Sequence, residues 1–196
     1  MKTKTVLVLS HAGVMGTDPF SGSTDLTALS LALKCIQRNG LTFDLVLGSP
    51  CPPVLVTAGM LADKVPFEPI RMLRPDGAMM QDVTPIFKDL GMFPSPEEIG
   101  QHPLVNRFDT LAEAVGWQID ALIEARNPSS VLIIVFPPIT NLVIHYLRCG
   151  ERGHSEPFKR VVLSDKFRAC EGYLLNDVIV GGKCSGGLDR RFPFQE

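Results

Sequence analysis

Two uninterrupted apolar runs constrain the fold of this chain more than any other feature. They are TVLVL at residues 5–9 and VLIIVF at residues 131–136. A strand with one face in water alternates apolar and polar residues, whereas a strand covered on both faces is apolar throughout, as in parallel sheets. A third run, FDLVL at residues 43–47, is nearly as apolar. These runs therefore predict three buried strands of a largely parallel sheet.

Segments with helical spacing of apolar residues lie between and after these strands. Asp25 can cap the helix expected at residues 26–37, and Asp109 can cap the helix expected at residues 108–126. The apolar face of the latter helix is expected to bury Trp117. Strands that alternate with helices of this length are typical of an α/β fold. We therefore predict a three-layer sandwich, with a mostly parallel central sheet flanked by helices. The expected helices span residues 26–37, 54–65, 108–126 and 139–147.

The chain is assigned to one domain and a tail. A length of 196 residues fits a single α/β domain, which we place at residues 1–180. Residues 74–106 hold five prolines and one short helical piece near 84–90, and they are predicted to be an insertion over the strand ends. Residues 181–196, with four glycines, are predicted to be a Gly-rich tail. Further strands at the margin of the sheet are expected at residues 158–163 and 173–180.

Composition and charge exclude several classes of protein. The chain has 19 Lys and Arg against 21 Asp and Glu, a net charge of -2, so it lacks the basic surplus typical of nucleic-acid binding and no nucleic-acid partner is expected. No apolar run approaches the roughly 18 residues of a membrane span, and the run at residues 5–9 is too short for a signal peptide. The five cysteines form no Cys-x-x-Cys pair, which favours reduced thiols, a cytoplasmic location and no bound metal.

Chemistry is expected in the loops that follow the strands, because ligands of open α/β sheets bind beyond the carboxyl ends of the strands. These ends are followed by SHAGVMG at residues 10–16, GSPCPP at 48–53 and PPITN at 137–141. The first loop has glycines only at Gly13 and Gly16, which is not the Gly-x-Gly-x-x-Gly spacing of a dinucleotide turn. A nucleotide- or cofactor-binding doubly wound domain is therefore a third hypothesis, ranked below the two that are given at the end of this section. No cofactor is expected.

Five short motifs are arranged in order along most of the chain. His11 follows the first strand within Ser10-His11-Ala12, and Leu26-Thr27 opens the next helix. Ser49-Pro50 follows another strand, with Thr57-Ala58 downstream, and Pro138 follows the central one. This order and spacing resembles the histidine phosphatase superfamily, which has the phosphoglycerate-mutase-like fold, and is nearest to its small phosphohistidine phosphatases.

The resemblance implies a fold and a set of site residues. In the family, a histidine after the first strand is the nucleophile, while two arginines and a second histidine hold the phosphoryl oxygens. His11 occupies the nucleophile's position, but Ser10, Pro53 and Phe136 stand at the three supporting positions. The resemblance therefore implies a phosphatase scaffold in which the phosphate-handling side chains are replaced.

Replacement of those side chains predicts weak or absent catalysis. A phosphoryl group carries about two negative charges, and each lost donor costs on the order of 3 kcal/mol of transition-state stabilisation. The first hypothesis is a catalytically silent or strongly impaired protein whose cleft binds an unknown small ligand or protein partner, with a homodimer as one expected assembly. The residues expected to line this cleft beside His11 are Ser10, Ser49, Pro53, Phe136 and Pro137.

Relocated side chains would instead give an active enzyme, which is the second hypothesis. His11 would be the phospho-acceptor of a phosphohydrolase, with positive charge supplied by Arg71 and Arg74. His102, in the proline-rich segment, would add an accessory contact to the pocket. Cys51 is expected to be a buried structural cysteine, because the neighbouring prolines offer no base or cation to activate its thiol.

Overall fold

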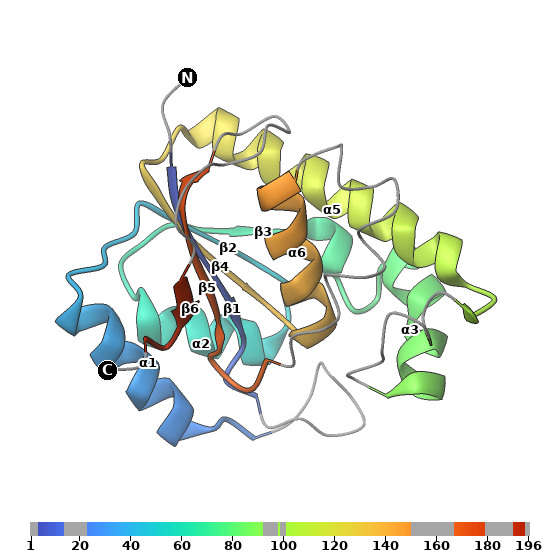
Figure 1. Cartoon of the computed structure of the whole chain (residues 1–196), viewed down its shortest axis with the longest axis horizontal. Coiled ribbons are helices and arrows are strands. Elements are labelled where there is room, and N and C mark those ends of the chain that lie inside the picture. Colours follow the sequence, from blue (N-terminus) through green and yellow to red (C-terminus); the bar gives the residue numbers. More distant parts are fainter. Residues whose placement is uncertain are drawn as a thin grey trace.

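The computed structural model of the chain describes residues 4–13, 23–91, 98, 101–149, 167–178 and 190–194. Helices cover both faces of a sheet in this structure (Figure 1). No helix within these ranges is long and apolar enough to cross a membrane. The elements in chain order are β1 (Lys4–Ser10), α1 (Leu26–Arg38), β2 (Leu45–Gly48), α2 (Pro52–Leu61), β3 (Phe67–Pro69), the short 3₁₀ helix η1 (Arg71–Leu73), α3 (Ala78–Leu90), α5 (Val105–Arg126), β4 (Ser130–Val135), α6 (Pro137–Cys149), β5 (Gly172–Val178) and β6 (Arg190–Phe192).

A six-stranded sheet forms the middle layer, in the order β3-β2-β4-β1-β5-β6. Strands β3, β2, β4 and β1 run parallel, whereas β5 is antiparallel to β1 and β6 is antiparallel to β5. The three predicted buried strands are β1, β2 and β4, and β4 lies between the other two. Their place between two layers of helices explains their continuously apolar sequences. The predicted α/β fold, with a mostly parallel central sheet flanked by helices, is confirmed.

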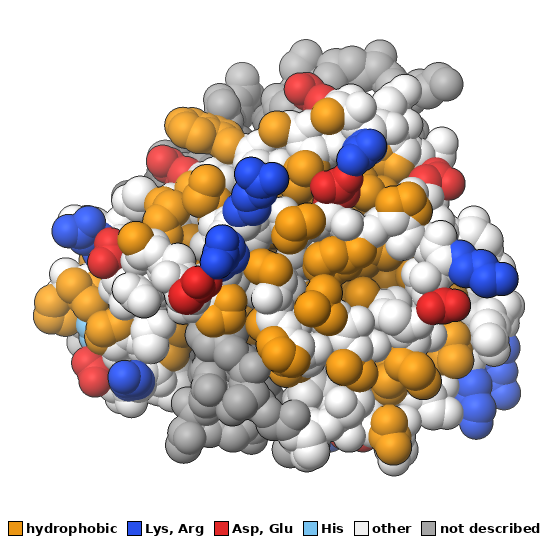
Figure 2. Space-filling view, turned by 180° about the vertical axis from the view of Figure 1, so that it is seen from behind, with side chains coloured by type: hydrophobic (Ala, Val, Ile, Leu, Met, Phe, Trp, Pro, Cys, Tyr) orange, Lys and Arg blue, Asp and Glu red, His pale blue; other side chains and the backbone are white. Residues whose placement is uncertain are grey.

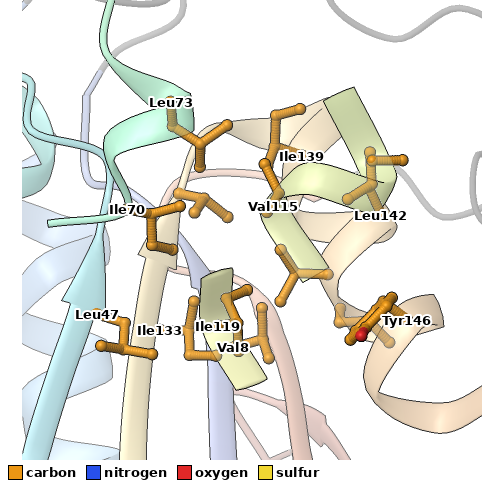
Figure 3. Packing of buried hydrophobic residues seen from close by; sticks show 14 of the residues in the cluster. Val8, Leu47, Ile70, Leu73, Val115, Ile119, Ile133, Ile139, Leu142 and Tyr146 are labelled. Atoms are coloured by element: carbon orange, nitrogen blue, oxygen red, sulfur yellow. The ribbon is translucent and has the colours of Figure 1, made fainter. Parts of the chain in front are cut away.

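Alternate residues of the central strands pack into two separate cores. On β1, Val6 and Val8 face the core shared with α3, α5 and α6, while Leu7 and Leu9 face the core shared with α1 and α2. This alternation is the two-residue period of a strand buried on both faces. In Figure 3, side chains from the sheet, from α5 and from α6 meet in the first of these cores.

The N-terminal ends of the helices follow their local sequences. Asp25 caps α1 as predicted, because its Oδ1 accepts the N–H of Ala28 at 2.9 Å. Helices α2 and α6 start earlier than predicted, at Pro52 and Pro137. Proline fits the first turn of a helix, where its missing N–H would have no partner within the helix.

Helix α2 is apolar on almost every side and cannot bury all of its side chains. Val54 and Ala58 lie in the core with α1, whereas Leu55, Val56 and Met60 remain 47, 46 and 53% exposed. Figure 2 views the molecule from behind the view of Figure 1, and it shows apolar side chains gathered over the middle of this face. The helix therefore contributes apolar surface to the outside as well as to the core.

The proline-rich segment contributes to the main core, which differs from the predicted insertion with a short helical piece. Helix α3 begins at Ala78 and continues to Leu90, with Pro85 inside it. Pro85 is exposed, so the carbonyl that loses its helical hydrogen bond can face water. The helix persists because one of its faces is buried against α5 and the sheet; the buried side chains are Met80, Val83, Ile86 and Phe87.

Two predictions about α5 are wrong. Asp109 is inside this helix and does not cap it, because the helix already begins at Val105. Trp117 is 59% exposed, whereas a place in the core was predicted. Val115 and Ile119 are fully buried, and at about 100° per residue Trp117 projects from the opposite side of the helix.

Strand β6 lies within residues 181–196, which were assigned to a tail. Its Phe192 is fully buried and pairs with Gly172 on β5, so three residues of the predicted tail form the edge strand of the sheet. The burial of one aromatic side chain and the hydrogen bonds to β5 hold this strand in place. Of the two later strands expected, 173–180 corresponds to β5, and 158–163 lies outside the described residues.

Asp44 connects the loop before β2 to the start of β4. Its Oδ2 accepts the backbone N–H groups of Ser129 and Ser130 at 2.8 and 3.1 Å. These hydrogen bonds favour the carboxylate and hold the pKa of Asp44 below its ordinary value of 3.8. A pKa that is lowered in the folded state stabilises the fold above the unfolded-state pKa, and this stabilisation is lost as the pH falls through the folded-state value.

We expect Asp44→Ala to lower the free energy of unfolding by about 1 kcal/mol at pH 7, and by progressively less as the pH falls below 3.8 and through the lowered pKa of the folded state. Chemical denaturation of both proteins across this pH range measures the difference. Glu113→Ala, at an exposed position of α5, is the control and should show no such pH dependence. A loss for Asp44→Ala that stays constant from pH 7 to pH 3 would contradict the role given to the ionised carboxylate.

Candidate functional site

His11 lies at the carboxyl end of the central strand β1. Its backbone N–H donates to the Val135 carbonyl at 2.8 Å, which continues the pairing of β1 with β4. Ser10 is held on the other side, because its N–H donates to the Glu171 carbonyl at 2.9 Å. The His11 side chain is buried, with 2% of the residue exposed. The predicted placement of this histidine after the first strand is therefore what the structure shows.

A backbone hydrogen bond fixes the imidazole ring of His11. The N–H of Gly13 donates to Nδ1 at 2.8 Å. Nδ1 therefore presents a lone pair, and the proton of the neutral ring is on Nε2. A Cβ atom on Gly13 would lie 2.7 Å from Nδ1 and 3.2 Å from the Cβ of Pro53. Only glycine fits this turn without displacing the ring, and Pro53 adjoins the same turn.

Two threonines join the three strand-end loops. Thr57 Oγ1 accepts the N–H of Ala12 at 2.8 Å and donates to the Pro53 carbonyl at 2.7 Å. Thr140 Oγ1 lies 3.0 Å from Ser10 Oγ and 3.3 Å from the carbonyl oxygen of Phe136. The loops after β1, β2 and β4 therefore converge, as predicted from the order of the strands.

Thr57 and Thr140 belong to the quoted motifs but were not among the candidate site residues. Each lies four residues after a carbonyl at the start of a helix, the spacing at which a threonine hydroxyl bonds back to the helix. That spacing was the signal in the sequence. Which loop each hydroxyl contacts on its other side depends on tertiary structure.

The remaining predicted wall residues are buried and are used by the fold. Ser49 Oγ donates to the Leu73 carbonyl at 2.8 Å and so holds η1 against the loop after β2. The Phe136 ring is fully buried and packs edge to face with Phe87 of α3, with ring centroids 6.3 Å apart. Pro137 is buried at the start of α6. Phe136 is therefore part of the core shared with α3, and its ring is not on the surface of an open cleft.

The arginines proposed as relocated phosphate ligands are at the edge of the sheet. Arg71 and Arg74 are exposed in and after η1, which follows β3. At about 4.8 Å per strand, β3 lies roughly 14 Å from β1 across the sheet. The Arg74 guanidinium pairs with the Asp76 carboxylate at 2.8 Å. The structure thus gives these arginines surface positions near β3 and does not place them beside His11.

His102 connects α3 to the start of α5. Its Nδ1 accepts the N–H of Leu104 at 3.1 Å, so Nε2 carries the proton that faces the Asp89 carboxylate at 3.2 Å. Leu104 is the residue before the first turn of α5 and has no side-chain cap of its own. His102 therefore holds the N-terminal end of α5. The second hypothesis instead expects this side chain to contact the pocket.

Two buried cysteines lie near the strand ends. Cys51 is fully buried, as predicted, and Cys170 donates its backbone N–H to the Ser10 carbonyl at 3.1 Å. Burial, with a smaller contribution from the negative charge of Asp25, raises the pKa of the Cys170 thiol to about 12. A thiol with this pKa is protonated at neutral pH and is a poor nucleophile. Among the described residues, no group of three or more His, Cys, Asp or Glu side chains could hold a metal ion.

Comparison with known proteins identifies the fold. No protein-family model and no curated protein matches the sequence. The structure is similar to the α-ribazole phosphatase from Shigella flexneri, with a TM-score of 0.54, 17% identity and coverage of 94% of this chain and 98% of that one. It is equally similar to a protein from Escherichia coli assigned as an α-ribazole-5′-P phosphatase, with a TM-score of 0.54, 14% identity and coverage of 94 and 100%.

A third similar structure is the product of an open reading frame from Mycobacterium tuberculosis, with a TM-score of 0.54, 16% identity and coverage of 94% of this chain and 99% of that one. All three likenesses extend over nearly the whole of both chains. Identities this low establish the fold alone. The chain therefore shares the fold of the α-ribazole phosphatases, and the predicted phosphoglycerate-mutase-like fold is confirmed.

Proposed function

We propose that this chain is a catalytically silent or strongly impaired histidine-phosphatase-like protein that acts by binding a small ligand or a protein partner. The observation that carries the proposal is the hydrogen bond from the Gly13 N–H to His11 Nδ1 at 2.8 Å. A histidine that attacks phosphorus through Nε2 needs its lone pair on Nε2 and its proton on Nδ1. The backbone around His11 favours the opposite tautomer.

The side chains at the three supporting positions also favour a silent site. Ser10, Pro53 and Phe136 are uncharged, whereas transfer of a phosphoryl group requires about two negative charges to be balanced. Ser10 is already in hydrogen-bond contact with Thr140. At on the order of 3 kcal/mol for each lost donor, the missing groups correspond to a rate loss of several orders of magnitude. A cytoplasmic location is part of this proposal and rests on the unpaired pattern of the cysteines in the sequence, and a homodimer is one assembly compatible with it.

We expect no turnover by the purified protein of p-nitrophenyl phosphate, of a phosphohistidine substrate or of α-ribazole 5′-phosphate. The last substrate is included because α-ribazole phosphatases have the same fold. His11→Ala, purified in parallel, is the control for contaminating phosphatases and should give the same background rate. Activity in the wild type that His11→Ala abolishes would overturn the proposal and favour an active phosphohydrolase.

A further inference from the structure

A hollow of about 680 Å³ lies between α1 and the end of the sheet at β6. Three cationic side chains line it: Lys34 and Arg38 from α1, and Arg190 from β6. The described residues that line this hollow include no aspartate or glutamate. A chain with a net charge of -2 thus concentrates positive charge at one concave place. Such a concentration attracts anions.

The two elements hold these cations in a defined arrangement. Lys34 and Arg38 are four residues apart on α1, so they project from the same side of the helix. Arg190 is fixed by the pairing of β6 with β5, opposite Leu174. Its guanidinium carbon lies 4.2 Å above the centroid of the Phe194 ring. A guanidinium stacked in this way keeps its N–H groups at the edge of the plane, where they can bind a carboxylate, sulfonate or phosphate.

An anion in the hollow would lie against Lys34 of α1 and Arg190 of β6. The carboxylate of Glu171, near this end of the sheet, pairs with Arg191 at 3.4 Å and not with Arg190. A bound anion would therefore receive charge-assisted hydrogen bonds from Lys34 and Arg190.

The same hollow has an apolar side that continues into a neighbouring one. Leu31, Pro193 and Phe194 line both the cationic hollow and a second hollow of about 440 Å³, which extends along α1 to Asp25. Leu31 is 56% exposed, although it is a large apolar side chain on the groove side of the helix. A ligand that covered it would gain apolar burial in addition to the charge contacts.

We propose that this groove binds a small amphipathic organic anion. Its negatively charged group would lie between Lys34 and Arg190, and its apolar body would lie over Phe194 and Leu31. The cationic end of the groove lies away from the site at His11. Helix α1 begins next to Ala12, where the Asp25 N–H donates to the Ala12 carbonyl at 2.6 Å, and the cationic hollow is at its other end. Arg38 is thirteen residues beyond Asp25, about 20 Å along the helix axis. The inference therefore goes beyond the proposed function and stands whether or not His11 is catalytic.

Two fluorescent probes that differ in charge test the inference on the full chain. 8-Anilinonaphthalene-1-sulfonate carries an anionic group on an apolar ring system, and N-phenyl-1-naphthylamine is its uncharged counterpart. We expect the sulfonate to bind more tightly, and its affinity to fall with rising salt while that of the uncharged probe does not. Lys34→Gln and Arg190→Gln should each weaken sulfonate binding about tenfold, the effect of losing one charge-assisted hydrogen bond.

Lys64→Gln and Lys88→Gln are matched controls, since both lysines are exposed and lie outside the groove. They should leave the affinity for the sulfonate unchanged, and all variants should bind the uncharged probe as the wild type does. Equal, salt-independent affinity of the wild type for the two probes would overturn the proposal. The same follows if the control variants lose as much sulfonate binding as Lys34→Gln and Arg190→Gln do. The salt dependence is measured on the wild type and decides the question even if a variant fails to fold.

Discussion

Gly172→Ala should unfold the protein or prevent its soluble expression. A Cβ atom at this position would overlap the carbonyl oxygen of Val8 and lie 2.8 Å from the carbonyl carbon of that residue and 3.0 Å from the Cα of Leu9. All three atoms are backbone atoms of β1, the strand that pairs with both β4 and β5. The clash cannot be relieved by a side-chain rotation, so one of the central pairings must open.

We expect this substitution to lower the free energy of unfolding by on the order of 4 kcal/mol or more, at the upper end for a single change. Chemical denaturation measures it, or the soluble fraction does if the variant does not fold. Gly59→Ala is the matched control, because a Cβ there meets nothing within 4 Å on the exposed side of α2. In a helix, alanine should raise the stability by roughly 0.5–1 kcal/mol. Similar stabilities of Gly172→Ala and the wild type would show that β5 does not lie against β1 in this register.

Gly116→Ala should give the second largest loss of folding stability, because the added methyl group drives α5 and α6 apart. A Cβ on Gly116 would run into the ring of Tyr146, with the ring Cζ only 2.6 Å away. The ring cannot easily turn aside, since its hydroxyl donates to Asp120 Oδ2 at 2.7 Å and the residue is 3% exposed. We expect a loss of about 2–3 kcal/mol, net of the better helix propensity of alanine.

A double-mutant cycle separates this clash from a general effect on the helix. Tyr146→Leu removes the ring that Gly116→Ala would strike, at the price of a cavity and the hydrogen bond to Asp120. The combined variant should therefore be more stable than the sum of the two single losses predicts, by more than about 0.5 kcal/mol. Additive losses in the cycle would show that the two residues do not touch and would contradict the packing of α5 on α6.

The sequence predicted those parts of the fold that depend on local pattern. Strands β1 and β4 follow from their apolar runs, and the start of α1 follows from Asp25. Strand β6 was missed because its stability comes from pairing with β5 and from the burial of Phe192, neither of which leaves a periodic pattern in three residues. Trp117 was misplaced because a large aromatic residue was assumed to be buried, although the helix has a fully apolar face without it.

The sequence predicted where the candidate site lies but not how its side chains are oriented. His11 and its neighbours at the strand ends follow from the motifs, since the order of buried strands brings their loops together. The direction of the Phe136 ring could not be read from the sequence, because it depends on how α3 packs against the sheet. The bond from Gly13 to His11 also depends on the turn after β1, and it is this bond that determines which ring nitrogen has the lone pair.

The protonation of the His11 ring tests the central claim most directly. Long-range proton–nitrogen correlation spectra of ¹⁵N-labelled protein identify the tautomer of each histidine, and the loss of one pattern in His11→Gln assigns this residue. We predict the neutral ring with its proton on Nε2 at pH 7, and no change on titration with orthovanadate, an anion that mimics a transferred phosphoryl group. A ring with its proton on Nδ1, together with vanadate-dependent shifts of its Nε2 resonance, would contradict a silent site and show that His11 can accept a phosphoryl group.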